Sequence, residues 1–327
     1  MVKKSRIHRV KRILMFARPG GTLGFTFDQH VIGLNSDNEK RFYVEVAKNE
    51  LTFEFLNTFD IFWFYAKAFH PSVYEQLYSH FGKTKKFIVG PNVLLDKPDI
   101  GISDAWDDWL VNKAKFHIQL DQVEFYNQHV KKFLPKEKLD LSTHLDKCMR
   151  LEIFDEDIKE TDRDIDCLVY SKKRRYDTYF DDFRKNIILG LDERKINYKE
   201  ITYGSYQKNE FLESLLRTKV MLNLSLDECP GILNYEAFYC NTHVIGSPHN
   251  TPSHYDTRLH VLDTDFMTEK YLVRKPEAAS SYMEKLDWFF EHSGKENLNS
   301  PREFVLYHTS YQRYCDDVYQ IIEKYCE

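Results

Sequence analysis

Short apolar runs alternate with longer amphipathic segments along most of this chain. The apolar runs have the length and the β-branched and aromatic content of buried strands, and the intervening segments repeat apolar residues at helical spacing. Strands are predicted at residues 12–17, 41–47, 59–65, 86–89, 115–120, 165–170, 198–203, 220–224 and 244–245. Helices are predicted at 71–81, 122–133, 178–192, 207–216 and 231–240, with one or two more at 304–326. Strands that alternate with helices form parallel, doubly wound sheets, so we expect an α/β fold.

The alternation weakens between residues 134 and 163, where Pro135 and several acidic residues favour an exposed linker. The chain of 327 residues is long enough for two domains with a core each. We therefore predict an N-terminal Rossmann-like domain at 1–155, a second one at 156–303 and a helical segment at 304–327. Ligands of such sheets bind beyond the carboxyl ends of the strands.

Composition excludes some classes of protein. Hydrophobic residues at 42% and charged residues at 30% indicate a globular chain and not a disordered one. The net charge of −5 argues against a general nucleic-acid binder. The six cysteines form no C-x-x-C pair and no metal-ligand spacing, so we interpret them as reduced thiols of a cytoplasmic protein.

The sequence predicts no membrane-spanning helix. Its most apolar run, 59–69, contains Asp60 and Lys67 and is much shorter than the roughly 20 residues that a span needs. The first twelve residues contain six Lys or Arg and lack the apolar core of a signal peptide. We expect this leader to be solvated, with a weak peripheral membrane contact as the alternative.

The stretch from Lys219 to Ser247 combines the features of an anion site. A buried strand ends in a polar turn, and Pro230 and Gly231 then begin a helix. Proline is tolerated at the start of a helix, glycine lets the backbone approach a ligand, and the first N–H groups of a helix attract anions. Glu228 precedes the helix and Glu236 lies on it, so we expect phosphate on the N–H groups and sugar hydroxyls on both carboxylates.

The segment from Glu228 to Gly246 resembles the E-x7-E signature of the retaining family 4 glycosyltransferases. It keeps both glutamates, the glycine, the Glu-Ala pair and the Val-Ile strand of that signature. It departs from the signature at Cys229, Pro230, Asn241 and His243, which leaves the subfamily open. A strand–helix–strand unit with solvated glutamates is the alternative interpretation.

The resemblance implies the GT-B architecture, in which two Rossmann-like domains face each other across a cleft and the segment 304–327 packs back on the N-terminal, acceptor-side domain. It implies a retaining, metal-independent glycosyltransferase with a nucleotide-diphosphate-sugar donor, no other cofactor, and a glycan, lipid-linked or protein-linked acceptor. Glu236 would bind the ribose and Glu228 the donor sugar, while the backbone of Gly231, Ile232 and Leu233 after Pro230 would hold phosphate or sugar.

Four cations, at Lys172, Lys173, Arg174 and Arg175, follow the strand 165–170 directly. In the resembling enzymes a basic residue or pair at this place binds the donor diphosphate and stabilises the departing nucleotide. The spacing of the family, arginine and then lysine five residues later, is not kept. We predict that Lys172 and Arg174 take the catalytic role, with Lys173 and Arg175 as substitutes. A solvated basic turn is the alternative.

Two glycine-containing turns complete the predicted site. Gly20 and Gly21 follow the first strand, where many GT-B chains approach the donor phosphate or the acceptor. Tyr203 and Gly204 follow the strand 198–203, where a ring or the backbone would contact the nucleotide base. Ordinary turns are the alternative for both pairs.

Other signals are set aside or left open. The triplet Asp263-Thr-Asp265 resembles the metal motif of the other glycosyltransferase fold, but such triplets arise by chance among 51 acidic residues. His70 and His117 lie at element ends and are interpreted as structural. A nucleotide-sugar epimerase, a non-catalytic sugar-nucleotide or glycan-binding module and a base-glucosylating enzyme remain alternatives, and the sugar, nucleotide and acceptor stay open.

Overall fold

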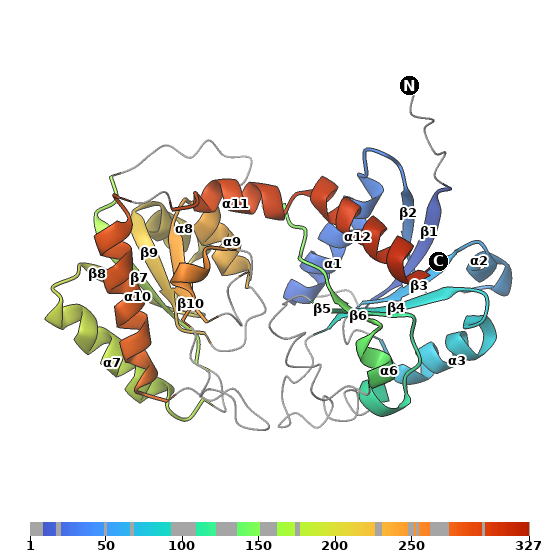
Figure 1. Cartoon of the computed structure of the whole chain (residues 1–327), viewed down its shortest axis with the longest axis horizontal. Coiled ribbons are helices and arrows are strands. Elements are labelled where there is room, and N and C mark those ends of the chain that lie inside the picture. The colour runs from blue at the N-terminus through green and yellow to red at the C-terminus, as the bar shows by residue number, and fades with distance from the viewer. Residues whose placement is uncertain are drawn as a thin grey trace. The chain divides into compact units, whose positions relative to one another are not determined.

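The structure is a computed structural model, and the course of its chain is shown in Figure 1. The residues that it describes are 9–17, 21–48, 51–65, 69–92, 109–121, 136–150, 162–173, 177–225, 231–247, 252, 255–261, 275–295 and 298–326. They divide into two compact units: unit 1 consists of Met1–Arg150 and His308–Glu327, and unit 2 of Leu151–Tyr307.

Unit 1 contains one parallel sheet with the strand order β2-β1-β3-β4-β5-β6. Its strands are β1 (Lys11–Phe16), β2 (Phe42–Val46), β3 (Ile61–Phe64), β4 (Lys86–Asn92), β5 (Ile118–Asp121) and β6 (Ser142–His144). Its helices are α1 (Gly21–Asn35), α2 (Phe53–Asn57), α3 (Pro71–Phe81), a π-helix at Trp109–Lys113, α6 (Lys136–Leu139) and α12 (Tyr311–Cys326).

The central strands of unit 1, such as β1 and β3, are buried on both faces, as expected for a parallel sheet covered by helices. Ile13, Met15 and Trp63 lie on one face, in a core that includes residues of α1 and α12. Leu14 and Phe62 lie on the other face, in a core that includes residues of α3 and the π-helix. The continuous apolar runs of these strands are therefore explained by two cores and not by one.

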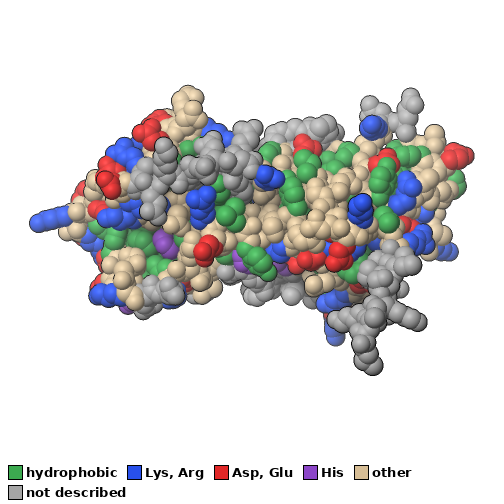
Figure 2. All heavy atoms as spheres, turned by 90° about the horizontal axis from the view of Figure 1, so that it is seen from above, with side chains coloured by type: hydrophobic (Ala, Val, Ile, Leu, Met, Phe, Trp, Pro, Cys, Tyr) green, Lys and Arg blue, Asp and Glu red, His purple; other side chains and the backbone are tan. Residues whose placement is uncertain are grey.

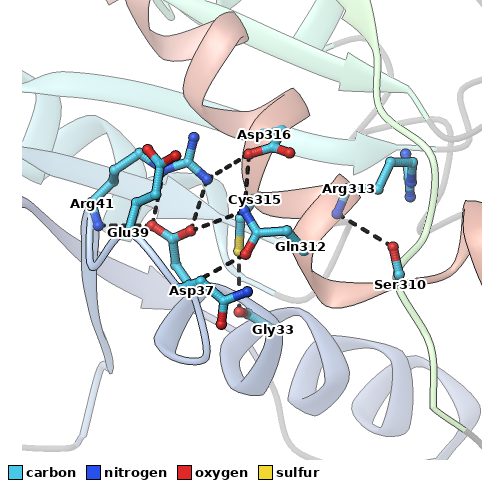
Figure 3. Close-up of polar contacts among 10 residues, drawn as sticks. Gly33, Asp37, Glu39, Arg41, Ser310, Gln312, Arg313, Cys315 and Asp316 are labelled. Atoms are coloured by element: carbon cyan, nitrogen blue, oxygen red, sulfur yellow. Dashed lines mark hydrogen bonds and ion pairs between the residues drawn. The ribbon is translucent and has the colours of Figure 1, made fainter. Parts of the chain in front are cut away.

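Helix α12 packs on α1 within unit 1 (Figure 1). An ion cluster joins α12 to the loop between α1 and β2 (Figure 3). Arg41 Nη2 donates to Asp37 Oδ1 at 2.7 Å and to Asp316 Oδ1 at 2.7 Å. Burial by itself would raise the pKa of Asp37, but the hydrogen bonds from Arg41 outweigh it and lower that pKa. Cys315 Sγ also donates to Gly33 O at 3.2 Å. These contacts fix α12 to unit 1.

The predicted exposed linker at 134–163 is wrong over residues 142–149. The three residues of β6 pair with β5, with Gln119 beside Ser142. Leu145, Cys148 and Met149 are then buried. The strand Ser142–His144 is polar and too short to show an alternating pattern, and only its pairing with β5 defines it. Residues 151–161 of the predicted linker and the predicted helix at 122–133 lie outside the described residues.

Unit 2 contains a parallel sheet with the order β10-β9-β7-β8. Its strands are β7 (Ile165–Ser171), β8 (Tyr198–Thr202), β9 (Thr218–Asn223) and β10 (His243–Gly246). Its helices are α7 (Phe180–Glu193), α8 (Lys208–Leu216), α9 (Ile232–Tyr239), a 3-10 helix at Thr257–Leu259, α10 (Ala278–His292) and α11 (Pro301–His308), whose last residue is assigned to unit 1.

The helices of unit 2 divide between the two faces of its sheet. Helices α7 and α10 lie side by side (Figure 1), with the Phe183 and Tyr282 ring centroids 5.5 Å apart. Helix α8 lies on the other face, where the ring centroids of Phe211 and Tyr170 of β7 are 6.0 Å apart. Phe304 of α11 packs on Phe238, with the ring centroids 5.6 Å apart, so α11 packs within unit 2.

The α/β class with two parallel sheets is confirmed, and every predicted strand forms within a few residues of its predicted ends. Helix α10 was absent from the predicted elements, although its buried residues repeat at helical spacing: Ala278, Ala279, Tyr282, Met283, Leu286 and Phe289. Within the described ranges, no helix is both long and apolar enough to cross a bilayer.

Candidate functional site

The sheet of unit 2 changes its direction of winding between β7 and β9, because β8 lies beyond β7 and β10 beyond β9. The two strands are neighbours in the sheet, with Tyr170 beside Asn223 at their carboxyl ends. After β7 the chain continues to α7 on one face, and after β9 it continues to α9, which contacts α8 of the other face. Such a divergence of two loops opens a crevice at the strand ends, and ligands of doubly wound sheets bind there. The predicted site residues of unit 2 that the structure describes follow β7, β8 or β9, or lie on α9.

The N-terminus of α9 has no side-chain cap among the described residues, and Gly231 is its N-cap residue. The N–H groups of the first turn have no partner inside a helix, and they carry the positive end of its dipole. Ile232 and Leu233, both predicted ligand residues, form this turn. Backbone N–H groups are therefore available for phosphate at the place that the sequence predicted.

Two buried asparagines hold this helix start against the sheet. Asn223 ends β9 and Asn234 lies in the first turn of α9, and Asn223 Nδ2 donates to Asn234 Oδ1 at 2.9 Å. Asn223 Oδ1 in turn accepts from the Ser225 N–H at 3.0 Å. Sequence analysis missed this pair. Its signal is two amides within apolar segments, since buried amides need partners.

Glu236 is almost fully buried, with 8% of its surface exposed. Burial raises its pKa to about 7, and the positive charge of Lys208 counteracts that rise in part. Within the part of the chain that the structure describes, no hydrogen bond or ion pair is found for its carboxyl group. The alternative interpretation of Glu236 as a solvated surface glutamate is therefore wrong.

Tyrosines lie near this carboxyl group. Tyr170 ends β7 and is buried, and Tyr206 precedes α8, with the ring centroids 6.4 Å apart. Burial raises the pKa of Tyr170, which is raised further by the hydrogen bond between these two tyrosines and by the negative charge of Glu236. Burial likewise raises the pKa of Tyr206. Both phenols therefore stay protonated near neutral pH and provide O–H groups beside Glu236.

The two described members of the predicted cation cluster point to different partners. Lys172 Nζ lies 4.3 Å from the centroid of the Tyr203 ring. Tyr203 is 59% exposed, so this ring offers a free surface beside the cation. Lys173 Nζ instead lies 2.5 Å from Asp181 Oδ2 of α7. Lys172 is thus directed toward the loop after β8, and Lys173 toward α7.

The remaining predicted residues are placed as follows. Gly204 has a φ of +82°, and no atom lies within 4 Å of the place that a Cβ would take, so its backbone conformation accounts for the glycine. Gly21 begins α1 in unit 1. The predicted residues Gly20, Arg174, Arg175, Glu228 and Pro230 lie outside the described residues.

The two histidines set aside in the sequence have structural contacts. His70 caps α3 by accepting from the Ser72 N–H at 3.3 Å, and His117 Nδ1 accepts from the Phe87 N–H at 3.0 Å. In the ranges that the structure describes, no three His, Cys, Asp or Glu side chains lie close enough to hold a metal ion.

Comparison with solved structures identifies the fold. HepE from Anabaena, solved in complex with UDP-glucose, is similar with a TM-score of 0.53, 8% identity and coverage of 96% of this chain and 99% of that one. Sucrose-phosphate synthase from Thermosynechococcus elongatus is similar with a TM-score of 0.58, 11% identity and coverage of 96% and 98%. The N-terminal domain of trehalose-6-phosphate phosphatase from Candida albicans is similar with a TM-score of 0.58, 11% identity and coverage of 98% of this chain and 98% of that one.

Sequence comparison finds no matching protein-family model and no matching curated protein. At 8–11% identity the structural likeness shows the fold and not the chemistry. The chain is therefore an α/β protein of the GT-B fold, as the resemblance predicted. Membership of family 4 stays a prediction.

Proposed function

We propose that the protein is a glycosyltransferase that moves a sugar from a nucleotide-diphosphate-sugar donor to a hydroxyl group of a glycan, lipid-linked or protein-linked acceptor. The donor binds to unit 2 at the carboxyl ends of β7 and β9. Transfer proceeds with retention of configuration and without a metal ion. The similarity to HepE, which was solved with UDP-glucose, supports the class of donor.

One observation carries this proposal: the buried Glu236 carboxyl group, with no fixed counter-ion found among the described residues, lies on the same helix whose N-terminus is uncapped. The helix start suits phosphate, and the carboxyl group one to two turns further along suits a pair of hydroxyl groups. A nucleotide diphosphate presents both groups, since its ribose hydroxyls follow the phosphates. A plain phosphate or a carboxylate ligand would leave Glu236 without a partner.

The cations supply the charge that the reaction needs. As the glycosidic bond breaks, negative charge develops on the departing diphosphate, and a fixed positive charge nearby stabilises the transition state. Lys172 takes this role with Arg174, since Lys172 lies beside the exposed Tyr203 ring whereas Lys173 lies beside Asp181 of α7. Glu228 binds the hydroxyl groups of the donor sugar. The acceptor then attacks from the face that the diphosphate leaves, with the leaving phosphate taking its proton.

The test compares two neighbouring lysines. Removing a charge-assisted contact to phosphate costs about 1.5–3 kcal/mol. Lys172→Ala should therefore weaken nucleotide diphosphate binding roughly ten- to hundredfold, while the matched control Lys173→Ala should leave it within about threefold. Binding is measured by calorimetry after a melting-temperature screen of UDP, GDP and ADP and their sugars. Equal losses in both variants, or none, would refute the assignment of Lys172.

Turnover separates the proposed activity from its alternatives. With the nucleotide from the screen, the sugar-loaded donor is incubated with the protein, and released nucleotide and sugar are analysed. Slow donor hydrolysis with retained anomeric configuration supports a retaining transferase. An epimerised sugar indicates the epimerase, and tight binding without any turnover, in the presence of varied acceptors, indicates a binding module.

A further inference from the structure

Lysines gather at the amino-terminal end of the strands in unit 1, here called the amino edge of the sheet, where β4 and β5 begin. Lys83 and Lys85 lie in the turn between α3 and β4, and Lys86 is the first residue of β4. The N–H of His117 donates to Phe87 O at 2.9 Å, which places Lys115, two residues earlier, beside the start of β4. Two separate connections of the chain thus bring four cations to this edge.

An exposed aromatic ring adjoins these lysines. Phe53 of α2 is 60% exposed, and among the described residues it is the one phenylalanine with so open a side chain. Its ring stacks on Phe81, the last residue of α3, with the centroids 5.1 Å apart. Lys85 Nζ donates to Asn57 O at 2.8 Å and so joins α2 to the turn. Phe53 therefore lies next to the cations.

The described acid beside Lys86 is already engaged by other groups. Asp60, which lies beside Lys86 at the start of β3, is already bound by Arg9 at 3.0 Å and by the Arg12 N–H at 3.0 Å. In the described ranges no ion pair is found for Lys83, Lys86 or Lys115. On the face drawn in Figure 2, by contrast, Lys, Arg, Asp and Glu side chains are interspersed.

The net charge of the whole chain is −5, so the four lysines mark a local field of the opposite sign. We propose that this amino-edge surface, formed by Phe53, Lys83, Lys85, Lys86 and Lys115, docks on the anionic surface of a lipid bilayer. The lysines are attracted by acidic headgroups, each by an amount that falls within a Debye length. Phe53 enters the headgroup region, where aromatic rings are favoured.

The net charge of −5 argues against a nucleic acid as the anionic partner, and an exposed aromatic ring beside the cations suits the headgroup region of a bilayer. Docking by the amino ends of the strands also leaves their carboxyl ends, where ligands of parallel sheets bind, turned away from the bilayer. This inference does not depend on the proposed donor site, because that site lies in unit 2.

The experiment measures co-sedimentation of the full chain with vesicles of phosphatidylcholine alone and of phosphatidylcholine with phosphatidylserine. The wild type should bind the acidic vesicles at low salt, release them at high salt, and ignore the neutral ones. Each lysine near an acidic surface is worth about fivefold in binding, so Lys83→Glu, Lys86→Glu and Lys115→Glu together should reduce it about a hundredfold or more.

A matched charge reversal in unit 2, at the exposed Lys185, Lys195 and Lys295, should reduce vesicle binding much less. Phe53→Ser should weaken binding to acidic vesicles at low salt. The proposal is wrong if the wild type does not bind acidic vesicles, if the two triple variants behave alike, or if double-stranded DNA competes the protein off the vesicles at low concentration. Melting curves of both triple variants exclude unfolding as the cause of a loss.

Discussion

The buried Glu236 makes stability depend on pH, and Glu236→Gln isolates that dependence. Burial raises the pKa of this carboxyl group from 4.5 to about 7. Between these two values the unfolded chain has lost the proton and the folded protein still holds it. Stability therefore falls as the pH rises through this window, and above pH 7, where both states are ionised, the loss is complete. Glutamine keeps the shape and has no charge to bury.

The magnitude follows from the two pKa values. A rise from 4.5 to about 7 is a shift of about 2.5, and at about 1.36 kcal/mol for each pKa unit the full loss is about 3 kcal/mol. The advantage of Glu236→Gln over wild type should therefore grow from under about 1 kcal/mol at pH 5 to about 3 kcal/mol at pH 8. For a domain the size of unit 2, that is roughly 6–12 °C in melting temperature.

The assay is thermal unfolding of both proteins without nucleotide across pH 5 to 8.5, followed by the circular dichroism signal. We expect the two melting temperatures to separate as the pH rises, with the variant higher. The matched control is Glu213→Gln on α8, an exposed glutamate, whose difference from wild type should be small at every pH. A Glu236 variant that melts below wild type at pH 8, or a constant difference at every pH, would refute the reasoning.

Three further substitutions test packing and backbone. A Cβ on Gly33 would lie 3.0 Å from the Tyr311 ring of α12 and 3.1 Å from Cys148 Sγ. Gly33→Leu should therefore overpack this contact, reduce stability by about 1–3 kcal/mol and lower the melting temperature. An unchanged melting temperature would contradict the packing of α1 on α12. Arg41→Ala leaves the Asp37 carboxylate, 1% exposed, without its cation and should cost about 3–5 kcal/mol in urea unfolding; a cost below 1 would show that water replaces the cation. Gly204→Ala should cost about 1–2 kcal/mol because its φ of +82° disfavours a side chain, and no loss would show that the turn relaxes.

The sequence predicts most of this fold because its strands are buried on both faces. Runs such as Ile61–Phe64 and Cys167–Tyr170 are apolar without interruption and are buried along their whole length. Amphipathic helices such as α12 are also evident, because its buried Tyr314, Val318 and Ile322 follow helical spacing. In these segments the hydrophobic pattern lies within the element itself, so a window of about ten residues is enough to predict whether it is a helix or a strand.

Elements defined by distant partners were not predictable in the same way. The strand Ser142–His144 exists because β5 offers an unpaired edge, and nothing in its three polar residues shows that. In the site, tertiary packing brings Asn223 to Asn234, Lys172 to the loop after β8 and Lys173 to α7. Local patterns found the residues of the site, but only the topology shows which of them share a face.

The burial of Glu236 is itself an argument about function. An ionised carboxyl group in this position costs the fold about 3 kcal/mol at neutral pH and above, by the shift in its pKa. A structural acid would recover that cost through a fixed cation, but within the described chain the nearest positive influence, Lys208, forms no ion pair with it. Strongly shifted acids without such a partner concentrate at binding and catalytic sites. A ligand whose two hydroxyl groups donate hydrogen bonds to this carboxylate would offset the cost only when it is bound. Nucleotide affinity and the pH dependence of stability should therefore both change in Glu236→Gln, and neither should change in the controls Glu213→Gln and Lys173→Ala.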